Sequence, residues 1–285
     1  MAKIGDLLRA GRTFSFEFFP PKTDEEQRVL VQTLRDLEPL DPSFVSVTYR
    51  GGRSSRERTT SLVAGLAQTT SLTPMAHLIC VAHTRLELAE ILVDFRKAGL
   101  ENVLALGGDP PTDPDSADGE LRHAIDLVEL ARAVGGYSIG VAAHPEGHPR
   151  SASRAEDRDR LAEKLRLADF AITQFFFRVE DYLGLLDDLE ARGVDKPVIP
   201  GIMPITNLRS VGRMAEMSGC EVPGEVVARI EAAGSDPADT WRAGVEVATE
   251  LCEKLLAEGA PGLHFYTLNR STATREIYAS LGLSA

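Results

Sequence analysis

The sequence has little of what several classes of protein require. Its three cysteines, Cys80, Cys220 and Cys252, are far apart and form no CxxC pair, which argues against a disulfide framework and a structural zinc site. No apolar run approaches the ~18 residues of a membrane-spanning helix. The 31 basic residues are outnumbered by 43 acidic ones, giving a net charge of −12, whereas nucleic-acid binding requires a basic stripe.

These absences predict a protein that works in a reducing compartment. The first residues, Met1 to Asp6, lack the apolar core of a secretory signal. We therefore expect a cytoplasmic protein with free thiols, no membrane partner and no nucleic-acid partner. The sequence leaves the oligomeric state open, and a homo-oligomer is compatible with it.

Length and composition favour one large α/β domain. The chain has 285 residues, of which 43% are hydrophobic and 26% charged, values typical of a globular protein with a large core. Two domains would also fit this length, but α/β barrels of this size commonly form one. No linker or low-complexity stretch divides the sequence, so we expect residues 1–285 to form a single domain.

Strand patterns and helix patterns alternate along the chain. Helix starts are marked by caps such as Thr23 and Thr84, each followed three residues later by a Glu. The expected strands are 14–19, 44–49, 75–80, 102–106, 138–143, 170–177, 197–202 and 262–268. The expected helices follow Thr23 and Thr84 and cover about 56–66, 121–134, 154–167, 180–190, 208–217, 223–233 and 237–257, with a short helix at the end.

Eight β-then-α units with strongly apolar strands predict a (β/α)8 TIM barrel. An open, doubly wound sheet is the structural alternative. It is disfavoured because no GxGxxG motif follows an early strand, and the run Gly107-Gly108-Asp109-Pro110-Pro111 cannot open a helix. In a barrel, the chemistry lies at the carboxyl ends of the strands.

Polar residues lie near the carboxyl ends of all eight expected strands or in the loops after them. One polar strand end would carry little information, but eight together predict a single polar pocket at the barrel mouth. These residues are Glu17, Thr48, His77, Asp109, His144, Glu146, His148, Gln174, Thr206, Asn207, Tyr266, Asn269 and Arg270.

Glu17 is the acid around which we expect this pocket to form. Its strand is otherwise apolar and ends at Pro20 and Pro21, and a buried carboxylate is costly unless it is paired, hydrogen-bonded or neutral. Strand alternation directs Ser15 and Glu17 into the barrel and the phenylalanines at 14, 16 and 18 toward the helices. A structural ion pair is the alternative role for this acid.

Asp109 and Gln174 are the other main candidates. Asp109 is expected on one strand face with Gly107 and Ala105, leaving room for a flat ligand, and a turn residue before Pro110 is its alternative role. Gln174 is expected within a strand among phenylalanines, where an unpaired amide is costly. Two acids and an amide suit a ligand with several donors, such as a pterin edge, with one acid protonating it.

The loop from His144 to His148 has two histidines at a metal-like spacing. Its prolines and glycine forbid the helix that would stack two imidazoles on one face, and no cysteine or third histidine has ligand spacing. We expect no metal and a loop that hydrogen-bonds a polar ligand. The charged run from Asp157 to Arg166 is expected to be a solvated helix face with local ion pairs.

Segments in order along nearly the whole chain resemble the methylenetetrahydrofolate reductase family. The most specific are Ser-Phe-Glu-Phe-Phe-Pro-Pro at 15–21, Ile-Thr-Gln-Phe-Phe-Phe at 172–177 and His-Phe-Tyr-Thr-Leu-Asn-Arg at 264–270. The resemblance implies a (β/α)8 barrel of the short bacterial form, without the regulatory domain of eukaryotic members. It implies reduction of 5,10-methylenetetrahydrofolate to 5-methyltetrahydrofolate, with NADH or NADPH supplying the hydride.

The resemblance also implies roles for the residues of the mouth. Glu17 matches the general acid that protonates N10 and opens the five-membered ring, which leaves a 5-iminium cation. Asp109 and Gln174 match pterin-binding positions, Asp109 lies where a negative charge favours the cation, and Tyr266 and Arg270 are assigned to the substrate with them. An apolar surround of phenylalanines would hold the Glu17 carboxyl neutral near pH 7.

Six residues match positions that line the flavin site in the family, and three positions depart from the family pattern. Gly107 stands where an Arg is common, His144 where a Tyr is common and Leu208 where a Phe stacks on the ligand. Each departure removes a cation or an aromatic face that contributes on the order of 1 kcal/mol. We therefore predict that FAD binds weakly, or that NADH passes its hydride directly to the folate. The matching residues are Thr48, His77, Ala143, His148, Asp157 and Lys164, and the departing residues His144 and Leu208 are assigned to the same cofactor site.

Other functions remain as alternatives. A barrel lyase or aldolase would require a Schiff-base lysine at a strand end, and no expected strand ends in Lys. A phosphate-binding barrel would require a glycine-rich loop after the seventh or eighth strand. A non-catalytic folate-binding or regulatory barrel fits the same motifs, and it would bind folate without oxidising NADH.

Overall fold

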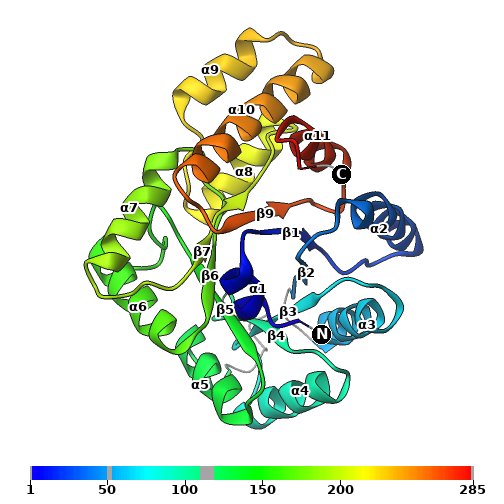
Figure 1. Cartoon of the computed structure of the whole chain (residues 1–285), viewed down its shortest axis with the longest axis vertical. Helices are drawn as coiled ribbons and strands as arrows, with labels where there is room; N and C mark the ends of the chain where they lie inside the picture. The colour runs from blue at the N-terminus through cyan, green and yellow to red at the C-terminus, as the bar shows by residue number, and fades with distance from the viewer. Residues whose placement is uncertain (1, 50–52, 110–118, 284–285) are drawn as a thin grey trace.

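The computed structural model describes residues 2–49, 53–109 and 119–283, which form a barrel of parallel strands inside a ring of helices (Figure 1). The expected α/β barrel is thus confirmed, whereas Pro110 and Pro111 lie outside the described residues. The strands are β1 Thr13–Phe18, β2 Phe44–Val47, β3 Pro74–Ile79, β4 Asn102–Leu106, β5 Ser138–Ala143, β6 Phe170–Thr173, β7 Val198–Ile199, β8 Gly201–Ile202 and β9 Gly262–Tyr266. The helices are α1 Ile4–Ala10, α2 Asp24–Leu37, the 3-10 helix η1 Glu38–Leu40, α3 Arg53–Thr69, α4 Arg85–Lys97, α5 Ala124–Val134, α6 Arg154–Leu167, α7 Val179–Glu190, α8 Leu208–Ser218, α9 Gly224–Ala232, α10 Pro237–Ala257 and α11 Thr272–Ser280.

The seventh expected strand is present in two halves. The strand order is β7-β6-β5-β4-β3-β2-β1-β9-β8, and every pair is parallel. Only Pro200 separates β7, which pairs with β6, from β8, which pairs with β9. Proline has no N–H for the ladder, but its carbonyl accepts a bond from the His264 amide at 3.0 Å. The nine strands are therefore the eight expected ones, closed into a barrel at Pro200.

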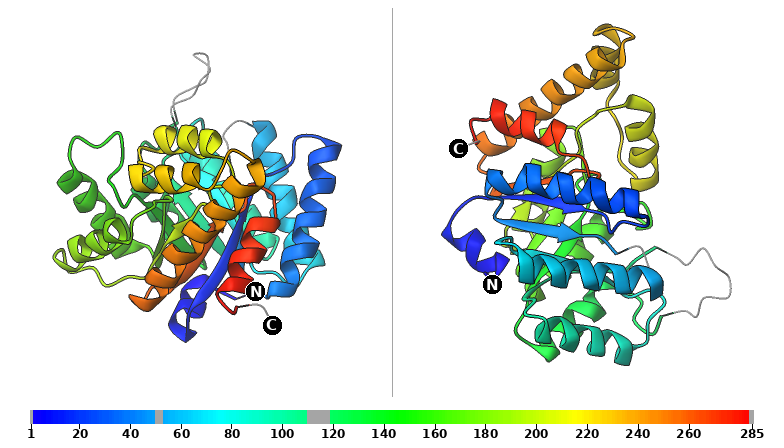
Figure 2. Two further views of the ribbon diagram at one scale, coloured as in Figure 1. Left: turned by 90° about the horizontal axis from the view of Figure 1, so that it is seen from above. Right: turned by 90° about the vertical axis from the view of Figure 1, so that its right-hand side faces the viewer.

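Helix α1 was not expected from the sequence. It spans seven residues, too few to show a helical period. Its first amides are bound by side chains at the amino ends of two strands, Ile4 N to Asn102 Oδ1 at 2.8 Å and Gly5 N to Ser138 Oγ at 2.9 Å. The helix thus covers the amino end of the barrel. Figure 2 shows α1 and the end of α11 at this end and α8, in yellow, at the opposite one.

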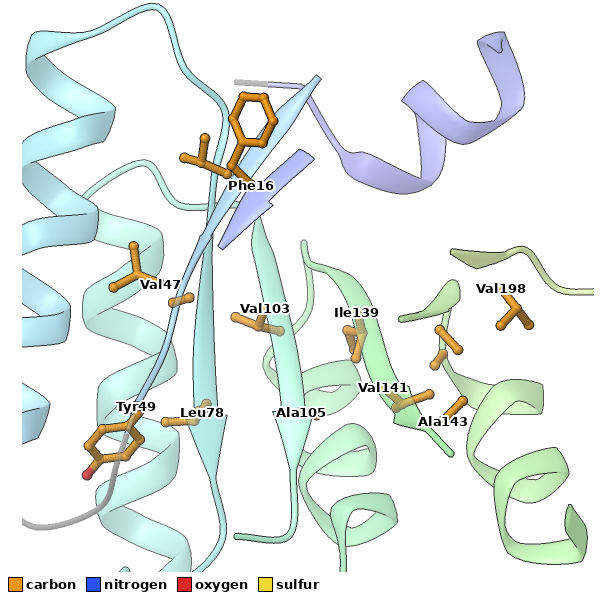
Figure 3. Packing of buried hydrophobic residues seen from close by; sticks show 14 of the residues in the cluster. Phe16, Val47, Tyr49, Leu78, Val103, Ala105, Ile139, Val141, Ala143 and Val198 are labelled. Atoms are coloured by element: carbon orange, nitrogen blue, oxygen red, sulfur yellow. The ribbon is translucent and has the colours of Figure 1, made fainter. Parts of the chain in front are cut away.

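The main core lies between the strands and the helices, as the alternation of β1 predicts. Phe16 and Phe18 are buried in this outer core, and the Phe16 ring lies 5.3 Å from that of Tyr278 on α11. Figure 3 shows residues of this cluster on successive strands, among them Val47, Val103 and Ile139. Ser15 and Glu17, on the other face of β1, lie inside the barrel.

The barrel interior has its own apolar floor. It is a small cluster made of one residue of α1 and several inward-facing strand residues, namely Ile4, Phe44, Met75, Leu104, Phe170, Ile172 and Ile199. Ala105 belongs to the outer core, so the expected shared face of Ala105, Gly107 and Asp109 inside the barrel is wrong. The inward-facing residue of β4 is the bulky Leu104. Side chains of a strand alternate between its two faces, so Ala105 faces outward toward the helices.

Two further features bear on the expectations from the sequence. Strand β6 ends at Thr173, so Gln174 follows the strand and does not lie within it. Cys80, Cys220 and Cys252 are all free thiols, as expected. No helix within residues 2–49, 53–109 and 119–283 is long and apolar enough to cross a membrane.

Candidate active site

A buried polar cluster surrounds Glu17 inside the barrel, above the apolar floor. Glu17 is 7% exposed. Its Oε2 atom lies 3.4 Å from His77 Nε2, 3.5 Å from His264 Nε2 and 3.4 Å from Ser46 Oγ. Ser15 completes the set through a 2.7 Å contact between its Oγ and His264 Nδ1. We call these five residues the acid cluster.

Strand register brings the acid cluster together. Glu17 of β1 is paired with Ser46 of β2 and with Tyr266 of β9, while Ser15 is paired with His264. Paired residues of neighbouring strands direct their side chains to the same face of the sheet. The inward faces of three consecutive strands in the barrel wall therefore meet around one carboxyl group, and β3 adds His77.

The acid cluster changes the expected charge state of Glu17. Burial alone would raise its pKa, but the hydrogen bond with His264 and the charges of His77 and His264 more than offset burial, so the pKa is lowered. The expectation of a carboxyl kept neutral by phenylalanines is wrong for a simple reason. Those rings lie on the other face of β1, and the face of Glu17 meets imidazole and hydroxyl groups.

Two buried polar atoms near the acid have no hydrogen-bond partner among the described residues. They are His77 Nε2 and Thr48 Oγ1, and both residues are at least 92% buried, with exposed fractions of 7% and 8%. Burial lowers the pKa of His77 and so favours the neutral ring, although the charge of Glu17 opposes this shift. Unpaired buried polar atoms are costly, so this part of the mouth suits a ligand with polar edges.

Gln174 lies across the barrel at the end of β6. Its backbone amide donates to the Ala143 carbonyl at 2.7 Å, and its Nε2 donates to Ser218 Oγ at 3.2 Å. The side chain lines a small pocket between the loop after β5 and the end of α8. The pocket lining includes His144, Glu146, Phe175, Gly219 and Cys220.

Tyr266 separates the acid cluster from the Gln174 side of the mouth. Its hydroxyl donates to the Thr173 carbonyl at 2.7 Å, and burial raises its pKa well above the usual value. The ring passes directly over Gly201, where an added Cβ would lie 2.6 Å from Tyr266 Cε2. Gly201 is therefore required for Tyr266 to reach across β8 to β6.

Asp109 and Arg270 lie away from the acid cluster. The Asp109 side chain is 98% exposed, and its Oδ1 lies 3.8 Å from Arg150 Nη2, which also donates to the Gly108 carbonyl at 3.2 Å. Arg270 is exposed and follows a turn in which Asn269 has a positive φ of 57°. Glu17 is buried by the protein itself, whereas Asp109 and Arg270 would be shielded from water only by a bound ligand.

The loop after β5 brings most of the residues matched to the flavin site together. The His144 and His148 rings make an edge contact at 4.6 Å, and burial, helped by neighbouring cationic groups, lowers the pKa of His144 to about 3. Lys164 Nζ donates to the Ala142 carbonyl at 3.1 Å, and burial lowers its pKa to about 8. Leu208 opens α8 at some distance in sequence. Within the described ranges, no three His, Cys, Asp or Glu residues could hold a metal ion.

Arg158 is a buried residue of the site that the sequence did not reveal. Its side chain is 1% exposed. It donates to the His144 carbonyl at 2.8 Å, the Pro145 carbonyl at 2.6 Å and the carboxylates of Asp157 and Asp188 at 2.8 and 3.1 Å. The expected solvated face is therefore wrong for Asp157 and Arg158, which anchor the loop after β5. Leu161 and Ala162, three and four residues after Arg158, lie on the same side of the helix and are buried. These apolar neighbours were the sequence signal that could have shown that Arg158 faces the core.

Comparison with known proteins gives a consistent result. The sequence profile of the methylenetetrahydrofolate reductase family matches residues 3–282. The 5,10-methylenetetrahydrofolate reductase of Pectobacterium carotovorum subsp. carotovorum is 37% identical over 270 residues, which cover 94% of this chain and 90% of that protein. Methylenetetrahydrofolate reductase (NADH) 1 of Arabidopsis thaliana is 33% identical over 297 residues, covering 99% of this chain and 50% of the plant protein.

A solved structure shares the barrel. It is an uncharacterized protein from Clostridium thermocellum that binds two copies of 5-methyl-5,6,7,8-tetrahydrofolic acid. Its TM-score is 0.68 at 15% identity, with 99% of this chain and 97% of that chain covered. At this identity, the likeness shows a common fold.

Proposed function

The chain belongs to the methylenetetrahydrofolate reductase family of oxidoreductases, and we propose that it reduces 5,10-methylenetetrahydrofolate to 5-methyltetrahydrofolate with NADH as the hydride donor. One observation carries the proposal, namely the buried carboxyl group of Glu17, set among histidines at the barrel mouth. The reaction consumes one hydride and one proton, so the site needs an acid. The name of the plant relative supports NADH as the donor.

Glu17 is proposed to deliver the proton to N10 of the folate. Protonation of N10 opens the five-membered ring, and the resulting 5-iminium cation accepts the hydride. Because the hydrogen bond with His264 and the charges of the two histidines lower the pKa of Glu17, the carboxyl on its own is ionised at neutral pH. The proton must therefore be held jointly with a neighbouring group of the acid cluster.

The remaining mouth residues are proposed to hold the folate. The Gln174 amide offers both a donor and an acceptor to the pterin, and Tyr266 offers its ring, since its hydroxyl is bound to Thr173. Asp109 would favour the cation, but an exposed charge acts through water and is worth about 1 kcal/mol or less until the ligand covers it. Arg270, at the rim, suits the carboxylates of the glutamate tail.

The residues fit only part of FAD. Thr48 Oγ1 and His77 Nε2 have no hydrogen-bond partner in the described part of the chain and would suit the polar edge of a flat ring, from either a flavin or a nicotinamide. Two positions of this site lack the expected groups. The space beside Gly107 is open, since an added Cβ would have only one neighbouring atom within 4 Å, at 3.9 Å, and glycine supplies no cation there. His144, with its low pKa, supplies no positive charge at neutral pH. We therefore propose direct hydride transfer from NADH.

Deuterium transfer tests the route of the hydride. The purified protein is mixed with 5,10-methylenetetrahydrofolate and [4,4-²H₂]NADH, and the methyl group of the product is analysed by mass spectrometry. Direct transfer places one deuterium in each methyl group. Transfer through a flavin would exchange the label with water, and mostly unlabelled product together with stoichiometric flavin in the visible spectrum would overturn the direct route.

The same assay separates the enzyme from the non-catalytic alternative. The proposed function requires NADH oxidation that depends on the folate and yields 5-methyltetrahydrofolate. Folate binding without NADH oxidation, with or without added FAD, would identify a binding or regulatory barrel instead.

A further inference from the structure

His264 is a fully buried histidine with both ring nitrogens engaged in the acid cluster. It is 0% exposed. Its Nδ1 lies 2.7 Å from Ser15 Oγ, and its Nε2 lies 3.4 Å from Ser46 Oγ and 3.5 Å from Glu17 Oε2. The long Nε2 contacts are of the kind that tighten when substrate binds. This ring connects the interior of the barrel to the proposed acid.

Packing fixes the orientation of this ring. Phe44 stacks on it at 5.9 Å with an interplanar angle of 14°, and Tyr266 meets it edge-on at 5.5 Å. Its backbone amide is bound to the Pro200 carbonyl at 3.0 Å. Because two rings and a backbone hydrogen bond hold the residue, the imidazole keeps Nε2 directed at Glu17.

We propose that His264 is a positioning residue that holds the proton for Glu17 between turnovers. This inference rests on the proposed function of Glu17. The proton leaves Nε2 as the Oε2–H bond forms, and it then leaves Oε2 as the N10–H bond of the folate forms. The pair is left as a neutral imidazole and a carboxylate, and it recovers one proton from solvent through Glu17, the more exposed partner.

His77 is the competing candidate, at 3.4 Å from the same oxygen. Its Nε2 forms no hydrogen bond with any described residue, whereas His264 has partners at both nitrogens. The groups facing His264 are Ser15 and Glu17 on β1, Ser46 and Phe44 on β2, His77 on β3 and Tyr266 on β9. Glu17 is the one acid among them that can take the proton from Nε2 and face the mouth.

The sign of the expected pH effect follows from the shared proton. A pair that binds one proton at either of two sites holds it to a higher pH than either site would alone. Removing the imidazole leaves only the carboxyl to bind the proton. The fall in kcat/KM at high pH should therefore move to lower pH.

Two isosteric variants test the proposal. His264→Gln keeps a side-chain amide near the position of Nε2, toward Glu17, but cannot titrate, and Ser15→Ala removes the partner of Nδ1 with little change in volume. In His264→Gln we expect the midpoint of the high-pH fall in kcat/KM for NADH oxidation to move down by about one pH unit or more. At a pH above the midpoint of the wild type, kcat/KM of the variant should then be about tenfold lower than that of the wild type. Ser15→Ala should shift it in the same direction by less. His123→Asn, at an exposed position before α5, is the matched control.

Each outcome has a definite meaning. An acid shift with recovered activity at low pH supports the proposal, and if His264→Gln does not fold, the shift in Ser15→Ala decides. An equal loss of rate at every pH, with an unmoved midpoint, overturns it and leaves His264 a structural residue. Glu17→Gln is measured alongside. If that variant is as active as the wild type, the proposed acid itself is wrong, whereas an inactive Glu17→Gln with an unmoved His264→Gln profile refutes only the role of His264.

Discussion

The low pKa of His144 makes a specific prediction about stability at acid pH. The folded protein holds this histidine neutral down to pH about 3, mainly because burial disfavours the charged imidazole and also because His148, Lys164 and Arg158 lie close to it. In the unfolded chain the ring has the ordinary value of 6.5. Since the folded pKa is the lower one, the stability that depends on His144 is present above pH 6.5 and is lost as the pH falls.

The magnitude can be worked from these two values. At pH 5 the unfolded histidine is almost fully protonated while the folded one is almost fully neutral. Lowering the pH from 7 to 5 should therefore cost about 2 kcal/mol of unfolding free energy through His144 alone. This figure depends little on the folded value, provided that it lies below about 4.5.

Urea unfolding at pH 7 and pH 5 checks this prediction. The free energy of unfolding is measured for the wild type, for His144→Asn and for the exposed control His123→Asn. His144→Asn should lose about 2 kcal/mol less than the wild type over this interval, whereas His123→Asn should behave as the wild type does. An identical loss in His144→Asn and the wild type would refute the reasoning, whatever the absolute stability of the variant.

Three further predictions follow from single contacts. Arg158→Met should cost about 3 kcal/mol of unfolding free energy, because it removes a buried cation with four bonds, and urea unfolding should show that Arg158→Lys costs less. Asn269→Ala should destabilise by about 2 kcal/mol, since it loses both bonds to the Phe19 backbone and puts Ala at φ 57°, and Asn269→Gly should be more stable than Asn269→Ala by about 1 kcal/mol. Tyr266→Phe should cost about 1 kcal/mol through the lost bond to Thr173, and a thermal melt that is unchanged would contradict this.

Much of the fold follows from local sequence patterns. The bounds of β4, β5, α6 and α10 agree with expectation to the residue, because each is long or sharply bounded by Gly, Pro or a capping residue. The caps at Thr23 and Thr84 accept bonds from the third residue of their helices, as expected. Helix α1 escaped prediction because its stability comes from tertiary bonds to Asn102 and Ser138, which no local pattern contains.

The candidate site was predictable in place but not in detail. Alternation in β1 directed Glu17 into the barrel, and the position of the strand ends brought Thr48, His77 and Tyr266 to the mouth. Alternation in β1 alone does not say which side chains of other strands meet Glu17 there. His264, two residues before Tyr266, shares its inward face, and the same rule applied backwards from Tyr266 would have found it.

The charge state of the acid required the register between strands. Glu17 lies among phenylalanines in sequence, yet its neighbours in space are His77, His264 and Ser46. Sequence neighbours in a strand lie on alternate faces, so the environment of an inward side chain is set by the adjacent strands. Arg158 was misjudged for a related reason, because its partners are loop carbonyls thirteen and fourteen residues before it.

The central claim is that Glu17 delivers the proton for reduction of 5,10-methylenetetrahydrofolate, and its direct test is the turnover of Glu17→Gln. The variant is compared with the wild type and with Glu25→Gln, an exposed acid in the first turn of α2, in folate-dependent NADH oxidation, after circular dichroism has shown that all three are folded. General acid catalysis typically contributes about 10²–10⁴-fold, so kcat of Glu17→Gln should fall by that factor while Glu25→Gln keeps the wild-type rate. A folded Glu17→Gln that turns over within about threefold of the wild type, far less than an acid contributes, would contradict the account.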